Sequence, residues 1–446
     1  KKAFTLAGTM KLIPERLDMF IEAVDSVSDS MSQLAAVGIT QNVPVNAAYN
    51  PTRSAIWTAF RYGTAPRQYQ NSGTLRRLVG GFRGRIGERF NWEASYNYNL
   101  NRLRTGQTGL YYNPNLQLAI FGGYDAAGNP QPGGRFARVF RDYAAPAGAS
   151  TLAQLQAALR PANSVLQPAL DFFARPGGVD PASLANVVGT SALLFEAPLT
   201  QVDARASGTL LELPAGPLGV AGGIDHRIEK IIGLPDVNSY STGPTGQRWT
   251  GGTFFDPVSR RRSIDAAFAE LRLPVASERM RIPLVRLLEL SAAYRYERYS
   301  DAGASRVPKY GLRWRPLGEE LTVRGTYSEA FAAPSLFALF GPVTQGSTAA
   351  AVIPSIFGVP GTANVRQGSN PGLRPSTAKT RSFGAVYSPK MIKGLTLGAD
   401  FVSVGQVSLV GTAGSAEILR SVNELGTASP YAAQVDRKST RLNSSH

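Results

Sequence analysis

The chain has 446 residues, a formal net charge of +16, 46 glycines, 30 prolines, two histidines and no cysteine. The lack of cysteine excludes disulfides, thiol nucleophiles and thiolate metal sites, and two histidines exclude a clustered-histidine metal centre. Charged residues are 17% of the chain, against about 25% in soluble domains, so with this much Gly and Pro the composition favours many strands joined by many turns.

The N-terminal residues do not resemble a targeting segment. The chain opens KKAFTLAGTMKLIPER without an initiator Met, and Thr5, Thr9 and Lys11 interrupt its apolar residues. No apolar run approaches the roughly 18–20 residues of a membrane helix. We therefore expect an internal start, and we expect any membrane contact to be made by a barrel or at the surface.

Twelve segments alternate between apolar and polar residues, the period of a β-strand. We predict strands near 4–12, 17–26, 76–86, 90–101, 202–212, 217–228, 263–273, 287–298, 307–315, 321–328, 380–388 and 395–404. In the clearest, FNWEASYNYNLN at 90–101, six apolar or aromatic residues occupy one face and six polar residues the other. This length exceeds the about 5–6 residues of a soluble strand and matches a membrane strand.

The connections between these segments alternate in length. Short gaps fall at 13–16, 87–89, 213–216, 316–320 and 389–394, and long gaps fall at 27–75, 102–201, 229–262 and 329–379. Only 299–306 is short where a long loop is due. Short turns at one end and long loops at the other are the layout of an outer-membrane barrel.

One long loop carries a helical pattern. The leucines of 151–173 recur at helical intervals around Pro161, which predicts one or two short helices packed in a loop rather than a partner-binding helix.

Motifs for catalysis and nucleotide binding are missing from the sequence. The glycine-rich GGFRGRIG at 80–87 lacks the spacing of a phosphate-binding loop, and no GxSxG elbow occurs. His226 lies beside Asp225 and Arg227 without a nucleophile, as in a surface residue. We predict no catalytic residue, no metal, no cofactor and no enzymatic activity.

The positive charge leaves several interpretations open. Arginine outnumbers lysine 38 to 9 and is spread along the chain, and no nucleic-acid-binding module accompanies it. Arginines at predicted lumen-facing positions fit either contact with anionic solutes or paired wall charges; these are Arg295, Arg313, Arg315 and Arg324. The run 260–262 fits either a phosphate-binding patch or a rim charge run. Candidate ligand contacts are Arg313 and Arg324, together with Tyr111, Tyr112 and Trp249, for which an interfacial or packing role is the alternative.

Two stretches resemble a known family. TYSEAFAAPSLFALF at 326–340 and SNPGLRPSTAKT at 369–380 are similar to motifs in the late barrel strands of TonB-dependent outer-membrane receptors. The matching residues are Tyr327, Ser328, Phe331, Ala333, Pro334, Ser335, Leu336, Leu339, Phe340, Asn370, Pro371, Leu373 and Pro375. The sequence departs from the motifs at Ala332, where Arg is common, and at Ala338 and Ser376, where Glu is common.

The resemblance implies a transmembrane antiparallel β-barrel, 22-stranded in the family, of which about twelve strands are recognised here. We expect residues 1–435 to be part of that barrel, incomplete at both ends, without the N-terminal plug and TonB box. We interpret 436–446, DRKSTRLNSSH, as a non-native tail.

The function that the resemblance implies is active import of a scarce nutrient across the outer membrane of a Gram-negative bacterium. Its ligand is siderophore-, vitamin- or carbohydrate-like, and its partners are the TonB energy-transduction complex, reached through the N-terminal part, and outer-membrane lipid and lipopolysaccharide. The alternatives are a passive porin or barrel adhesin and, less favoured, a basic soluble β-protein that binds nucleic acid.

Overall fold

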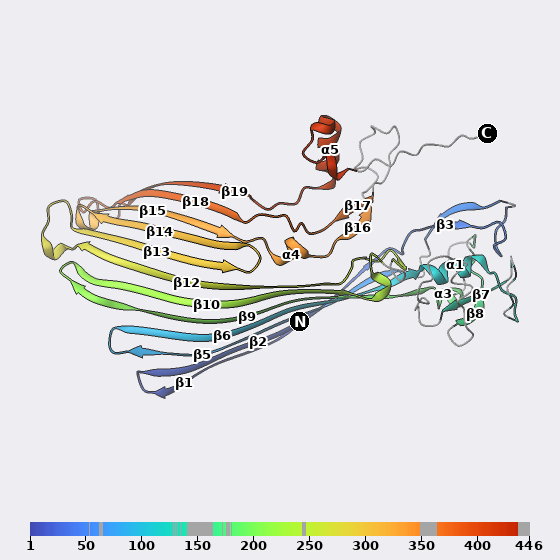
Figure 1. The fold of residues 1–446 in the computed structure, drawn as a ribbon, viewed down its shortest axis with the longest axis horizontal. Coiled ribbons are helices and arrows are strands. Elements are labelled where there is room, and N and C mark those ends of the chain that lie inside the picture. Colours follow the sequence, from blue (N-terminus) through green and yellow to red (C-terminus); the bar gives the residue numbers. More distant parts are fainter. Residues whose placement is uncertain are drawn as a thin grey trace.

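A computed structural model describes residues 1–52, 54–61, 66–127, 129, 131, 133, 135–140, 164–171, 173–174, 179, 181–242, 247–347 and 364–435. Its main feature is one antiparallel sheet in which twelve strands follow one another in chain order, from β1 at one edge to β19 at the other (Figure 1). Within the described residues, no helix has the length and hydropathy needed to cross a membrane.

The twelve predicted strands are all confirmed, and most extend further toward the long loops than the sequence pattern indicates. They are β1 (Lys2–Ile13), β2 (Leu17–Leu34), β5 (Arg67–Ile86), β6 (Phe90–Tyr112), β9 (Val188–Leu213), β10 (Gly216–Pro235), β12 (Val258–Ala276), β13 (Leu287–Tyr299), β14 (Gly303–Arg315), β15 (Leu321–Ala332), β18 (Ser376–Tyr387) and β19 (Leu397–Val407). A two-residue strand, β11 (Trp249–Thr250), adds to the end of β6. The alternation of short turns and long loops is confirmed with the strands.

The register gives the sheet two chemically different faces. One row of directly opposed residues, read from β1 to β13, is Met10, Met19, Phe82, Ala94, Ala204, Ile224, Ala267 and Tyr296. Its large members are exposed, and Ile224 has 65% of its surface accessible. A second row on this face ends in Leu290, Leu312, Phe383 and Phe401, all exposed, with Gly325 between the middle two. An exposed apolar surface this continuous is far larger than a monomeric soluble protein carries.

The neighbouring row lies on the opposite face and is charged. Lys11, Asp18, Arg83, Glu93 and Arg205 stand directly opposite one another on five successive strands, with alternating sign. Because side chains alternate between faces, a shift of one residue along each strand replaces the apolar row by this charged one.

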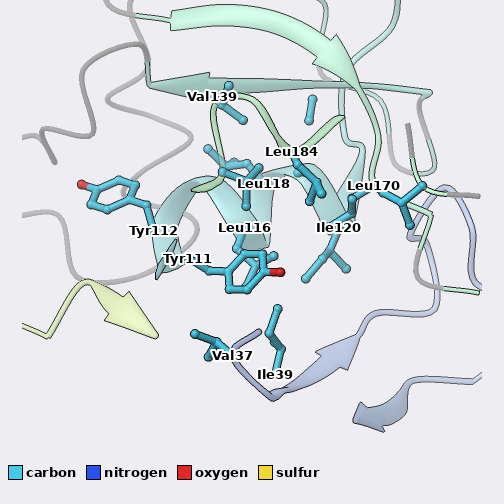
Figure 2. Close-up of a cluster of buried hydrophobic side chains, with 14 of the residues drawn as sticks. Val37, Ile39, Tyr111, Tyr112, Leu116, Leu118, Ile120, Val139, Leu170 and Leu184 are labelled. Atoms are coloured by element: carbon cyan, nitrogen blue, oxygen red, sulfur yellow. The ribbon is translucent and has the colours of Figure 1, made fainter. Parts of the chain in front are cut away.

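The long loops between β2 and β12 form a compact cap beyond one end of the strands (Figure 1). Its hairpins are β3 (Ile39–Val43) with β4 (Ile56–Phe60) and β7 (Phe136–Phe140) with β8 (Ser164–Pro168), and its helices are α1 (Asn113–Phe121) and α3 (Pro181–Leu184). These elements enclose a hydrophobic cluster that includes Val37, Ile39, Leu116, Leu118, Ile120, Val139, Leu170 and Leu184 (Figure 2).

The helical prediction for 151–173 is wrong for residues 164–168. Residues 164–168 form β8, because pairing with β7 satisfies their backbone groups and places Leu166 opposite Arg138. Residues 151–163 lie outside the described part of the chain, as does the 436–446 segment.

The later loops carry four further elements. They are α4 (Leu336–Phe340), the hairpin of β16 (Thr344–Ser347) with β17 (Asn364–Gln367), and α5 (Ser415–Leu425) after β19. All four lie toward the same end of the sheet as the cap (Figure 1).

Candidate functional site: the polar face and the long-loop end

The polar face of the sheet is lined by ion pairs that cross from strand to strand. Arg205 Nη2 lies 2.6 Å from Glu93 Oε1, and Arg83 Nε lies 3.8 Å from Asp18 Oδ2. These residues and their neighbours line an open cavity of about 800 Å³ at the short-turn end. Most of these side chains are partly exposed, so each pair contributes about 1 kcal/mol or less to stability. The polar face is therefore a partly exposed surface of mixed charge, which is called the wall below.

The most buried charges on this face lie toward the long loops. Arg295 donates to Asp225 over 2.7 Å and to Glu297 over 2.9 Å, and the Tyr299 hydroxyl donates to the other oxygen of Glu297 over 2.8 Å. Arg227 lies 3.4 Å from Glu229 on the same strand. Arg295 therefore forms a paired wall charge, which is one of the two roles that the sequence left open.

Arg262 connects this wall to the loop that follows β15. Its side chain is 5% exposed, and its Nε and Nη2 donate to Glu229 over 2.9 and 2.8 Å. Its Nη1 donates to the carbonyl of Pro334 over 2.9 Å, and its guanidinium lies 5.7 Å from the centre of the Tyr299 ring. Neither interpretation of the 260–262 run, phosphate patch or rim charge, describes this residue, because it is buried and fully engaged.

The Pro334 segment leads directly into α4. The Ser335 side chain accepts from the backbone N–H of Ala338 and so caps the helix, and Leu336 and Leu339 are buried. A free helix of five residues is unstable in water, so this cap and the packing hold it.

The two motif stretches, which residues 341–368 separate in the sequence, meet at α4. The Asn370 backbone N–H donates to the Ala338 carbonyl over 2.8 Å, and the Asn370 side chain accepts from the Gly372 N–H and closes a turn. Phe331 packs against Tyr299 with ring centres 5.5 Å apart. Motif residues thus shape the long-loop end of the wall.

The two arginines predicted to contact ligand lie at the other end. Arg313 and Arg324 are directly opposed on β14 and β15, close to the short turn at 316–320. Arg324 makes a bidentate pair with Asp400, reaching over Gly384 on the strand between them. A Cβ on Gly384 would collide with the Asp400 carboxylate, so glycine makes this bridge possible.

The three aromatic candidates are buried in the cap. Tyr111 and Tyr112 are 0% exposed and Trp249 is 3% exposed, and the Tyr112 and Trp249 rings meet edge to face with centres 5.4 Å apart (Figure 2 shows both tyrosines). Their burial fits the packing role that the sequence analysis gave as the alternative, and we do not propose ligand contact for them.

His226 is the one histidine among the residues that the structure describes. His226 lies on the apolar face, where its Nδ1 is 2.6 Å from Asp265 Oδ1 and both side chains are at least half exposed. Among the described residues, no group of three or more His, Asp and Glu side chains is placed to hold a metal ion.

Sequence reasoning missed α1 and the clamp formed by Arg262. Helix α1 has recognisable boundaries, with Pro114 in its first turn and Gly122 in the left-handed conformation at its end. Arg262 has no such local signal, because its partners come from positions 229 and 334.

Comparisons with known proteins agree with this arrangement. A family model described as TonB dependent receptor-like, beta-barrel, matches residues 35–401. No curated protein matches the sequence.

Several solved structures are similar to the chain. One is the RagAB peptide transporter, at 9% identity over 90% of this chain and 40% of that one, with a TM-score of 0.43. The siderophore receptor PirA from Pseudomonas aeruginosa has 11% identity over 90% of this chain and 55% of that one, with a TM-score of 0.33. The ferric enterobactin receptor PfeA from the same organism, a mutant in complex with enterobactin, has 13% identity over 90% and 53%, with a TM-score of 0.33. The chain thus spans about half the length of these structures or less.

Proposed function

The chain belongs to the TonB-dependent receptor-like β-barrel family. We propose that it forms part of the barrel wall of an outer-membrane active transporter for a scarce nutrient. The proposed nutrient is siderophore-, vitamin- or carbohydrate-like, and the proposed energy source is the TonB complex. We also propose contacts with outer-membrane lipid and lipopolysaccharide for the apolar face.

The two-faced register of the sheet is the observation that supports this proposal most. The row from Met10 to Tyr296 offers an apolar surface to lipid, and the row from Lys11 to Arg205 offers a charged surface to a wetted lumen. Strands of 11 to 26 residues are long enough to cross the hydrocarbon layer at a tilt. A soluble sheet of this size would have to cover its apolar face.

The orientation follows from loop length. Outer-membrane barrels have short turns on the periplasmic side and longer loops outside. The cap, α4 and the β16–β17 hairpin are therefore proposed to lie outside the cell, where a ligand would first meet the protein.

Epitope accessibility in a Gram-negative host tests both membrane insertion and orientation. One epitope is inserted at Asp301–Ala302, the short turn at the long-loop end, and a matched one at Gly87–Glu88, a short turn at the opposite end. The first is expected to bind antibody on intact cells, and the second only after the outer membrane is permeabilised. Recovery of the chain in the soluble fraction, or the reverse accessibility, would contradict the proposal.

Transport is tested separately with the full-length gene product, by uptake of labelled candidate nutrients with and without a functional TonB complex. Uptake that continues unchanged without TonB would exclude active import and favour a passive pore.

A further inference from the structure

A small pocket opens at the long-loop end of the wall, beside α4. We call it the mouth pocket and define it by Arg260, Phe340, Arg366, Ser369 and Asp256. It has a volume of about 280 Å³, which suits one end group of a ligand rather than a whole one. Its lining comes from β12, α4, β17 and the loop before β12, so only the folded chain forms it.

Two arginines line the mouth pocket without a carboxylate partner among the described residues. The ion pairs of the described chain include neither Arg260 nor Arg366. The undescribed segments nearest in sequence, 243–246 and 348–363, contain no Asp or Glu at all. Arg77 and Arg313 on the polar face also lack an ion pair among the described residues, so what distinguishes Arg260 and Arg366 is that both line one pocket.

The one carboxylate in the pocket is already engaged elsewhere. Asp256 accepts hydrogen bonds from the Ser241 hydroxyl over 2.8 Å and from the Thr242 hydroxyl over 2.9 Å. Burial opposes ionisation of Asp256, but these hydrogen bonds outweigh it and lower the pKa of its carboxyl. Asp256 is therefore ionised and already accepts three hydrogen bonds, and with the two arginines the pocket keeps an excess of one positive charge.

The other walls hold the first arginine in place and supply apolar surface. The Arg260 guanidinium lies 5.4 Å from the centre of the Phe340 ring, and its Nη1 donates to the Ser259 carbonyl over 3.0 Å. Both contacts restrain the side chain, and its Nε and Nη2 make no hydrogen bond to the described residues and face no competing acceptor there. Leu339, Pro342 and Pro371 add apolar lining beside it.

We propose that the mouth pocket binds an anionic oxygen group, a carboxylate or phosphate, of the transported solute through Arg260 and Arg366. The planar guanidinium fork matches both groups in geometry, and charge-assisted hydrogen bonds of this kind are the strong ones. The inference rests on the proposed import function, since it names the chemistry of the solute.

The run 260–262 supplies its own control. Because strand residues alternate, Arg260 and Arg262 lie on the polar face and Arg261 on the other. Arg261 has the same charge and a neighbouring position, but it does not line the pocket.

The test is equilibrium dialysis of the full chain in detergent micelles against radiolabelled citrate, inorganic phosphate and neutral glucose. Citrate, phosphate or both are expected to bind saturably, and Arg260→Gln and Arg366→Gln are each expected to weaken that binding by about tenfold or more. Arg261→Gln is expected to bind as the unsubstituted chain does. Circular dichroism and heat-dependent gel mobility verify that each variant is folded.

Two results would overturn the inference: anions that bind no better than glucose, or equal anion binding by all three variants. Phosphate that displaces bound citrate indicates a general anion site, and phosphate that does not displace it indicates a site selective for carboxylate. This readout is independent of transport. If the full-length gene product shows no TonB-dependent uptake while anions still bind, the import function is refuted and the pocket is not. If it shows TonB-dependent uptake while anions do not bind, the pocket alone is refuted.

Discussion

Replacing Arg262 by Met is expected to destabilise the chain more than any other single arginine change on the polar face. Methionine keeps most of the stem volume but removes the guanidinium that bridges Glu229 and the Pro334 carbonyl. Removing one partner of a buried ion pair costs about 3–5 kcal/mol, because the other charge stays buried and unpaired. Glu229 keeps 28% of its side chain exposed and has Arg227 at 3.4 Å, so we expect the lower end, about 3 kcal/mol.

The measurement is the free energy of unfolding by urea, with the chain inserted in lipid vesicles. Arg261→Met is the matched control and should change stability by no more than about 0.5 kcal/mol, as surface substitutions do. The double variant Arg262→Met with Glu229→Gln should cost less than the sum of its single changes, since neutral Gln removes the unpaired charge.

A result for Arg262→Met within about 0.5 kcal/mol of the unsubstituted chain would refute the clamp. Additive effects in the double variant would show that Arg262 and Glu229 act independently, which would also contradict the geometry.

Two further predictions concern the sheet itself. Ile224→Arg places a charge on the apolar face and should destabilise the vesicle-inserted chain by up to about 2–4 kcal/mol. Its control, Asn97→Arg on the polar face, should leave the free energy of unfolding nearly unchanged. Equal losses of stability in urea unfolding would argue against a lipid-facing surface. Gly384→Ala should displace the Asp400 carboxylate and break its exposed pair with Arg324, which should lower stability only slightly because solvent screens the pair. Gly398→Ala has open space at its Cβ and should lower stability even less in the same assay, and a large loss at position 384 would mean that the backbone cannot adjust.

The twelve-stranded sheet could be predicted because its physics is local. A strand residue points to one face of the sheet or to the other according to whether its position is odd or even, so the alternation of 90–101 specifies the two faces without knowledge of the neighbouring strands. The ends of the strands are harder to predict. Strand β6 continues to Tyr112 because pairing with β9 and β11 extends it into the cap. There the length of the strand is set by its neighbouring strands and not by the alternation of its own residues.

The site was predicted less well, for a physical reason that Arg324 and Arg262 illustrate. Both are arginines on polar-face positions, and the sequence does not distinguish them. Arg324 forms an exposed ion pair near a short turn, whereas Arg262 is buried and bridges Glu229 and Pro334. The difference arises because the loop after β15 covers Arg262, and the sequence around each arginine does not show which loop residues will lie over it.

The sequence by itself therefore determined the class of protein, the twelve strands, the two faces and the family, since each follows from local periodicity or a contiguous motif. Only the tertiary structure decided which charges are paired, which aromatic rings are buried in the cap, and which arginines meet in the mouth pocket. Those properties arise where segments such as 256–262, 336–341 and 366–371 converge, and no local pattern encodes the distances between them.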